Sequence, residues 1–123
     1  LANRMAIWQG LILGSPTNGD KGAGTLNTAG RVYTNDNLVP YRLEGSTTFD
    51  PASLTDAAGV TTTVTVAGAA LGDMALASFS NALQGITVTA WVSAADTVSV
   101  RFQNESGGTL DLASGTLKAW VLK

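Results

Sequence analysis

The sequence predicts an all-β protein, an antiparallel β-sandwich or jelly-roll-like barrel with an extended N-terminal arm. In the second half of the 123 residues, apolar and polar side chains alternate with the period of two that marks half-buried strands. These stretches recur about every 10–12 residues between turn-forming sequences, as in sandwiches and barrels. Helix signals are slight: residues 50–54 open with an N-cap and a proline, but the pattern ends by Gly59, so at most one helical turn is expected.

Six stretches after residue 59 are expected to be strands, and each is bounded by a turn signal. They are residues 60–66, 74–80, 86–92, 98–103, 110–112 and 117–121. The period of two places one set of side chains in the interior: Val60, Thr62, Val64, Val66, Ile86, Val88, Ala90, Val92, Val98, Val100, Phe102, Leu117, Ala119 and Val121. Ser99, Arg101 and Gln103 are expected to face outward.

The composition changes near residue 49, and two parts are predicted there. Residues 1–48 are rich in Gly and Asn with poor periodicity, which indicates an extended arm or attachment segment; residues 49–123 form the β-sandwich domain. Such a segment is long for a loop in a compact domain. Lying across a partner would bury its apolar and aromatic side chains, of which we single out Ile7, Trp8, Leu11, Tyr33 and Tyr41 as interface candidates. The alternative is that the segment adds strands to the same domain.

Two tryptophans are expected to point away from the sandwich core. Trp91 falls on the side of Thr87 and Thr89, and Trp120 falls on the side of Lys118. Burying one such ring is worth roughly 2–3 kcal/mol, and exposed apolar clusters usually mark an interface. Both residues are therefore candidates for an interface with sister subunits, the arm or a larger assembly. The alternative is that a β-bulge shifts a register and returns one ring to the core.

Composition excludes several classes of function. The net charge of −2 with seven basic residues gives no basic patch for nucleic acid. The absence of His and Cys removes Ser-His-Asp and Cys-His catalysis, disulfides and zinc sites built on these residues. No apolar run approaches the roughly 20 residues that span a bilayer. We therefore expect no catalytic residues, cofactor, metal, small-molecule substrate, nucleic-acid partner or membrane partner, and the chain is not expected to be an enzyme.

Three local motifs are better explained by loops than by chemistry. Gly22-Ala23-Gly24 beside Lys21 lacks the spacing of a phosphate-binding loop. Most aspartates lie beside turns, where a carboxylate accepts hydrogen bonds from nearby amides, and incidental metal binding is the alternative. Asn104-Glu105-Ser106 matches a glycosylation acceptor, but a glycine-rich loop explains these residues without it.

Five runs together make up a series of turns and strand faces: residues 49–54 (FDPASL), 59–66 (GVTTTVTV), 70–73 (ALGD), 94–104 (AADTVSVRFQN) and 111–117 (DLASGTL). With these runs the chain resembles small β-rich structural proteins of tailed bacteriophages, over about residues 49–122. Such domains occur among capsid decoration (cement) proteins and among tail or fibre components. The resemblance carries over no catalytic residue, and it does not include the N-terminal segment.

The resemblance implies a non-enzymatic virion structural protein. The first expectation is a capsid decoration protein that binds at capsomer junctions on the capsid surface and stabilises the head. Its partners would be the major capsid protein and sister subunits, and the resemblance favours a homotrimer. A low share of charged residues suits close subunit contacts, and many weak contacts become strong by repetition. The alternative is a tail or fibre component that binds a receptor or glycan, with Trp91, Arg101 and Gln103 as its surface.

Overall fold

The chain divides into two compact units, residues Leu1–Val39 and Pro40–Lys123. The computed structural model describes residues 7–8, 11–12, 33–34, 37–38 and 40–123. In the first unit the described backbone forms two short antiparallel pairs. One joins β1 (Ile7–Trp8) to β2 (Leu11–Ile12), and the other joins β3 (Tyr33–Thr34) to β4 (Asn37–Leu38).

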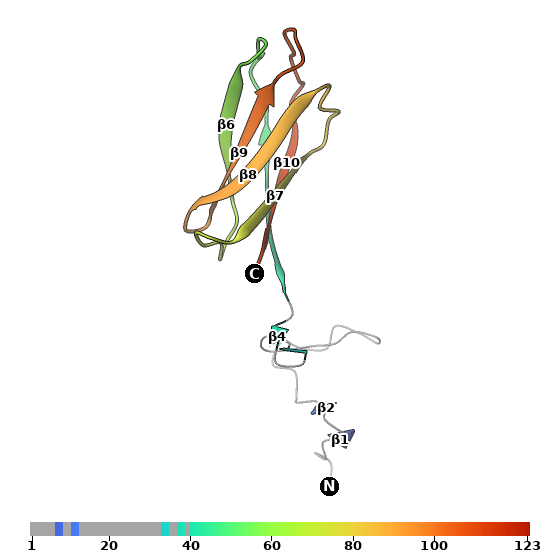
Figure 1. Ribbon diagram of the computed structural model, residues 1–123, viewed down its shortest axis with the longest axis vertical. Helices are drawn as coiled ribbons and strands as arrows, with labels where there is room; N and C mark the ends of the chain where they lie inside the picture. Colours follow the sequence, from blue (N-terminus) through green and yellow to red (C-terminus); the bar gives the residue numbers. More distant parts are fainter. Residues whose placement is uncertain (1–6, 9–10, 13–32, 35–36, 39) are drawn as a thin grey trace. The chain divides into compact units, whose positions relative to one another are not determined.

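The second unit is a sandwich of two three-stranded antiparallel sheets (Figure 1). One sheet has the order β5-β10-β7, with strands Arg42–Phe49, Gly115–Leu122 and Met74–Phe79. The other has the order β6-β9-β8, with strands Gly59–Thr65, Thr97–Asn104 and Ile86–Ala94. Within this unit only β8 and β9 follow each other as a hairpin, and the other connections cross between the sheets. The predicted all-β class is confirmed, in its sandwich form.

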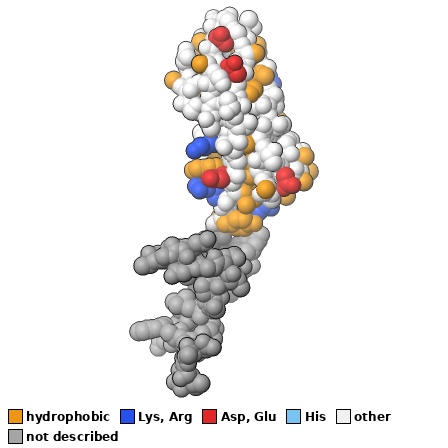
Figure 2. Space-filling view, turned by 180° about the vertical axis from the view of Figure 1, so that it is seen from behind, with side chains coloured by type: hydrophobic (Ala, Val, Ile, Leu, Met, Phe, Trp, Pro, Cys, Tyr) orange, Lys and Arg blue, Asp and Glu red, His pale blue; other side chains and the backbone are white. Residues whose placement is uncertain are grey.

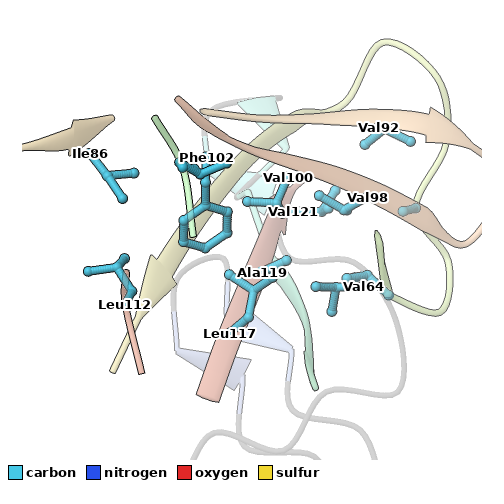
Figure 3. Close-up of a cluster of buried hydrophobic side chains, with 13 residues drawn as sticks. Val64, Ile86, Val92, Val98, Val100, Phe102, Leu112, Leu117, Ala119 and Val121 are labelled. Carbon is cyan, nitrogen blue, oxygen red and sulfur yellow. The ribbon is translucent and has the colours of Figure 1, made fainter. Parts of the chain in front are cut away.

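The core lies between the two sheets and matches the period-of-two pattern of the sequence. Figure 3 shows side chains of β9 and β10 meeting there, among them Val100, Phe102 and Leu117, all with no exposed surface. Phe102 contacts two further rings, Phe49 at 5.4 Å and Phe79 at 5.3 Å between centroids, the latter edge to face. Burying a ring of this size stabilises the fold by roughly 2–3 kcal/mol. Phe102 on β9 therefore packs against rings from both edge strands of the opposite sheet.

Strand β5 shows where the sequence pattern was incomplete. It pairs along its whole length with β10, so residues 42–49 belong to the sandwich, and the compact unit begins before the boundary expected at residue 49. Its inward positions include Gly45 and Thr47, which carry no apolar signal. A Cβ at Gly45 would overlap the carbonyl oxygen of Thr65 on β6. Close approach of β5 to β6 thus requires glycine at a position where alternation would call for a large apolar residue.

One smaller expectation, the strand at residues 110–112, was wrong. No helix forms among residues 40–123, which agrees with the expected limit of one helical turn, and Leu54 forms an isolated bridge with Leu110. That bridge replaces the strand expected at residues 110–112. Both backbone bonds of the pair are made, at 2.8 and 2.9 Å. The backbone polar groups here are hydrogen-bonded between two loops at the end of the sandwich, and not within an extended sheet.

Asn104 holds the same end of the sandwich together. It is fully buried, and its Nδ2 donates to the carbonyls of Leu54 (2.8 Å) and Gly108 (2.7 Å), while its Oδ1 accepts from the amide of Ser106 (3.0 Å). The side chain thereby fixes the loop after β9 to the loop after β5. Because both hydrogens of Nδ2 are used inside the protein, the folded domain does not present this asparagine as a glycosylation acceptor.

Candidate interaction surfaces

The sandwich has two outer faces, one on each sheet, and strand register defines which side chains each presents. The first, which we call the Trp120 face, consists of the outward residues of β5, β10 and β7: Arg42, Glu44, Ser46, Thr48, Met74, Leu76, Ser78, Thr116, Lys118, Trp120 and Leu122. The second, the threonine face, consists of those of β6, β9 and β8: Thr61, Thr63, Thr65, Thr87, Thr89, Trp91, Thr97, Ser99, Arg101 and Gln103.

Trp120 stands at the middle of the first face on the central strand. It lies opposite Glu44 on β5 and Leu76 on β7, and the residue is 39% exposed. The Arg42 guanidinium carbon lies 4.3 Å from the ring centroid, within cation–π range, and Arg42 also pairs with Glu44 at 3.3 Å. Both charged side chains are at least half exposed, so the ion pair adds little stability. Its effect is to orient the guanidinium over the ring.

Shallow depressions flank the ridge formed by Lys118 and Trp120. One, of about 160 Å³, is bounded by residues 44–46 of β5. The other, of about 310 Å³, is bounded by residues 76–78 of β7. A protruding ring between two hollows gives this face relief that a partner's side chains can fill.

The Trp120 face continues into an exposed apolar strip along β7. Met74 is 70% exposed, Leu76 57%, and Leu71 in the preceding loop 72%. Figure 2, the view from behind, shows hydrophobic side chains together with Lys, Arg, Asp and Glu side chains in the lower half of the domain. Aromatic residues, Met and Arg are the types enriched at protein interfaces. The Trp120 face therefore combines surface relief with residue types that are frequent at protein interfaces.

The threonine face is different in chemistry. Of the large apolar side chains that are exposed in the described part of the chain, it carries only Trp91, which lies opposite Ser99 and is 44% exposed. The irregularity in β8 falls between Val92 and Ala94, after Trp91, so it leaves the ring outside the core. Ser99 was expected to be outward and is, but it is 7% exposed and bonds Ser93 at 2.8 Å. Threonines occupy most of the remaining positions.

Arg101 lies half-buried at the centre of the threonine face. Its Nε and Nη2 donate to Gln103 Oε1 at 3.1 and 2.7 Å. The Gln103 amide in turn donates to the carbonyl of Ala57 (3.0 Å) and to Glu105 (2.8 Å). The guanidinium is thus held by a side chain that is itself fixed at both ends.

The interface candidates named from the sequence are not brought together on one surface. Trp91 and Trp120 lie on opposite faces. Tyr41 is 40% exposed and its backbone pairs with Lys123 in both directions. The remaining candidates, Ile7, Trp8, Leu11 and Tyr33, have backbone in β1, β2 and β3, but their side chains lie outside the described residues.

Sequence reasoning missed part of the Trp120 face. Met74 and Leu76 alternate with two alanines in β7, and the alanines face inward. That inversion of the usual pattern, with large apolar residues outside and small ones inside, was visible in the sequence. Arg42 had no such signal, because its strand was not recognised.

Three of the described aspartates accept hydrogen bonds from loop amides. Asp56 accepts from the amide of Gly107 (2.8 Å), and Asp96 accepts from that of Gly68 (2.7 Å). Asp73 pairs with Lys123 at 3.0 Å, and hydrogen bonds from Lys123 and then from the Ala70 amide hold the pKa of its carboxyl below the ordinary value. Among the described residues no three His, Cys, Asp or Glu side chains are grouped to hold a metal ion.

In the described part of the chain, no helix has the length and apolar character needed to cross a membrane. Comparison of the whole sequence and structure with protein families, curated proteins and solved structures gave no match.

Proposed function

We propose that the chain is a non-enzymatic structural protein of a tailed-phage virion, a capsid decoration protein that docks at capsomer junctions through its Trp120 face. Its partners are the major capsid protein and sister subunits arranged as a homotrimer. The observation that carries the proposal is the apolar strip of Trp120, Leu76 and Met74, left exposed on a sandwich whose core is already complete. Exposing apolar surface of this kind to water is unfavourable in free energy, and covering it with a partner removes that penalty.

The size of the Trp120 face favours a role in a repeated assembly. Two strands of eight residues and one of six, spaced about 4.8 Å apart with about 3.3 Å per residue, present a face on the order of 350 Å². Stable two-protein interfaces bury about 800 Å² per partner. One copy therefore binds weakly through this face alone. Simultaneous contacts with neighbours on a symmetric shell make such weak contacts strong.

Co-sedimentation with capsids of the phage that encodes the chain tests the proposal. The full chain is added to particles that lack it, and bound copies are counted by gel densitometry and located by electron microscopy. We expect many copies over the shell. Trp120→Glu should remove binding by placing a charge in the contact, while Trp91→Glu, the matched change on the opposite face, should leave it intact.

A few copies confined to the tail would contradict the decoration role and support the second candidate, a tail or fibre component that binds a receptor or glycan. The presence of both exposed Trp91 and half-buried Arg101 on the threonine face favours that candidate. Loss of particle binding with Trp91→Glu but not with Trp120→Glu would likewise contradict docking through the Trp120 face.

A further inference from the structure

Arg101 has no carboxylate partner among the described residues. The two ion pairs there are Arg42 with Glu44 and Lys123 with Asp73. Arg101 instead bonds an uncharged amide oxygen, that of Gln103. It is the basic residue of the threonine face, and the acid nearest to it in the bonded network, Glu105, is joined to it only through Gln103. A half-buried cation with neutral partners favours an anionic ligand.

The guanidinium is also preorganised. A Cβ at Gly59 would lie 2.5 Å from Nη2 and 2.8 Å from Cζ, so the guanidinium rests directly over this glycine. Together with the two bonds to Gln103 Oε1, this seat fixes both its position and its plane. A group already fixed loses little side-chain entropy when a ligand binds.

The edge of the guanidinium that is not bonded to Gln103 can bind a carboxylate with two hydrogen bonds. Of five N–H hydrogens, Nε and one of Nη2 are used on Gln103, and Nη1 has only a long contact of 3.4 Å to Thr61 Oγ1. Nη1 and Nη2 each keep a hydrogen on their shared outer edge. Two parallel N–H groups in this arrangement match the two oxygens of a carboxylate.

The other features of the threonine face fit a sugar. Trp91 offers a flat exposed ring, the type of surface on which the C–H face of a pyranose stacks. The hydroxyls of Thr63, Thr87 and Thr89 have no hydrogen-bond partner among the residues that the structure describes. A protein or acidic peptide would need several apolar anchors, and Trp91 is the one large apolar side chain exposed here.

The spacing sets the length of the ligand. Trp91 lies opposite Ser99, and Gly59, beneath the guanidinium, lies opposite Gln103. Four positions along β9 correspond to about 13 Å, with the width of two strand spacings across the sheet. A single sugar ring does not span that distance, but a short oligosaccharide does.

We infer that the threonine face binds an acidic oligosaccharide, with one carboxylate on the Nη1–Nη2 edge of Arg101 and another ring stacked on Trp91. The inference names a ligand class for a face opposite the Trp120 face, and it does not rest on docking to a capsid. It holds for a decoration protein as well as for a tail component, because occupation of the Trp120 face leaves this sheet free.

Calorimetric titration of the full chain with trigalacturonate, its methyl ester and sialylated oligosaccharides tests the inference. We expect at least one carboxylated sugar to bind at millimolar concentration or better, and its neutral ester to bind at least tenfold more weakly. Arg101→Gln and Trp91→Ala should each weaken binding about tenfold or more. Arg101→Lys, which keeps the charge but loses the fork, should also weaken it.

Trp120→Ala is the matched control, and it should leave sugar binding unchanged. Because the ester comparison uses the unaltered chain, it remains decisive if an Arg101 variant unfolds. Binding of none of the carboxylated sugars, equal binding of acid and ester, or equal binding by Arg101→Gln would overturn the inference. So would tighter binding of a hexaglutamate peptide than of any acidic sugar, since it would assign the face to a peptide. None of these outcomes affects particle binding through Trp120.

Discussion

Asn104→Ala should destabilise the sandwich more than the loss of a polar side chain at the surface would. The side chain is fully buried and makes three hydrogen bonds to two loops, two as donor and one as acceptor. At about 1 kcal/mol each, their loss costs about 3 kcal/mol. Asn104→Asp keeps the shape but replaces the Nδ2 donor with a carboxylate oxygen, an acceptor, facing the carbonyls of Leu54 and Gly108. It should cost at least as much, because it buries a negative charge against two acceptors.

Urea unfolding followed by tryptophan fluorescence measures this cost. With a slope of about 1.5 kcal/mol per molar urea, a loss of 3 kcal/mol lowers the midpoint by about 2 M. Asn81→Ala is the matched control. Asn81 also makes three hydrogen bonds, donating to the carbonyls of Ala113 (2.7 Å) and Ser114 (3.2 Å) and accepting from the Ser80 hydroxyl (3.2 Å), but it is only half-buried.

Water can replace the lost bonds of Asn81, so we expect a cost near 1 kcal/mol for its removal. Equal midpoints for Asn104→Ala and Asn81→Ala would refute the reasoning that burial, rather than the number of hydrogen bonds, sets the cost.

Three further predictions concern stability. Gly45→Ala should cost roughly 1–3 kcal/mol by forcing β5 from β6, whereas Gly108→Ala, where a Cβ meets nothing within 4 Å, should cost little; equal urea midpoints would contradict this. Phe102→Ala should cost about 3–5 kcal/mol in the same assay, and a cost below 1 kcal/mol would show that the ring cluster is not the centre of the core. The hydrogen bond from Lys123 lowers the pKa of the Asp73 carboxyl, so the ionised carboxyl should stabilise the folded state above pH 3.8. This stabilisation should be lost as the pH falls through the folded-state pKa. A difference in unfolding free energy between the wild type and Asp73→Asn that does not shrink on acidification would contradict this.

Most of the fold could be predicted from alternation, since the inward residues of β6, β8, β9 and β10 form the core. Strand β5 could not, because its inward Gly45 is selected by the approach of a backbone carbonyl rather than by hydrophobicity. The bridge between Leu54 and Leu110 was equally hidden, since pairing between distant loops leaves no local pattern.

The candidate surfaces were predictable one strand at a time. Register alone placed Trp91 and Trp120 outside the core. That they lie on opposite faces depends on which strands share a sheet, and strand order does not follow from local sequence. The outward direction of Arg101 was expected, but its fixed position was not, because that position depends on a glycine in a neighbouring strand.

Oxidative footprinting of Trp120 and Trp91 on the assembled particle tests docking most directly. Hydroxyl radicals label exposed rings, and mass spectrometry compares each ring in the free chain and in the particle. We expect labelling of Trp120 to fall several-fold on assembly while that of Trp91 stays as in the free chain. Unchanged labelling of Trp120 in the particle, or protection of Trp91 alone, would contradict docking through the Trp120 face.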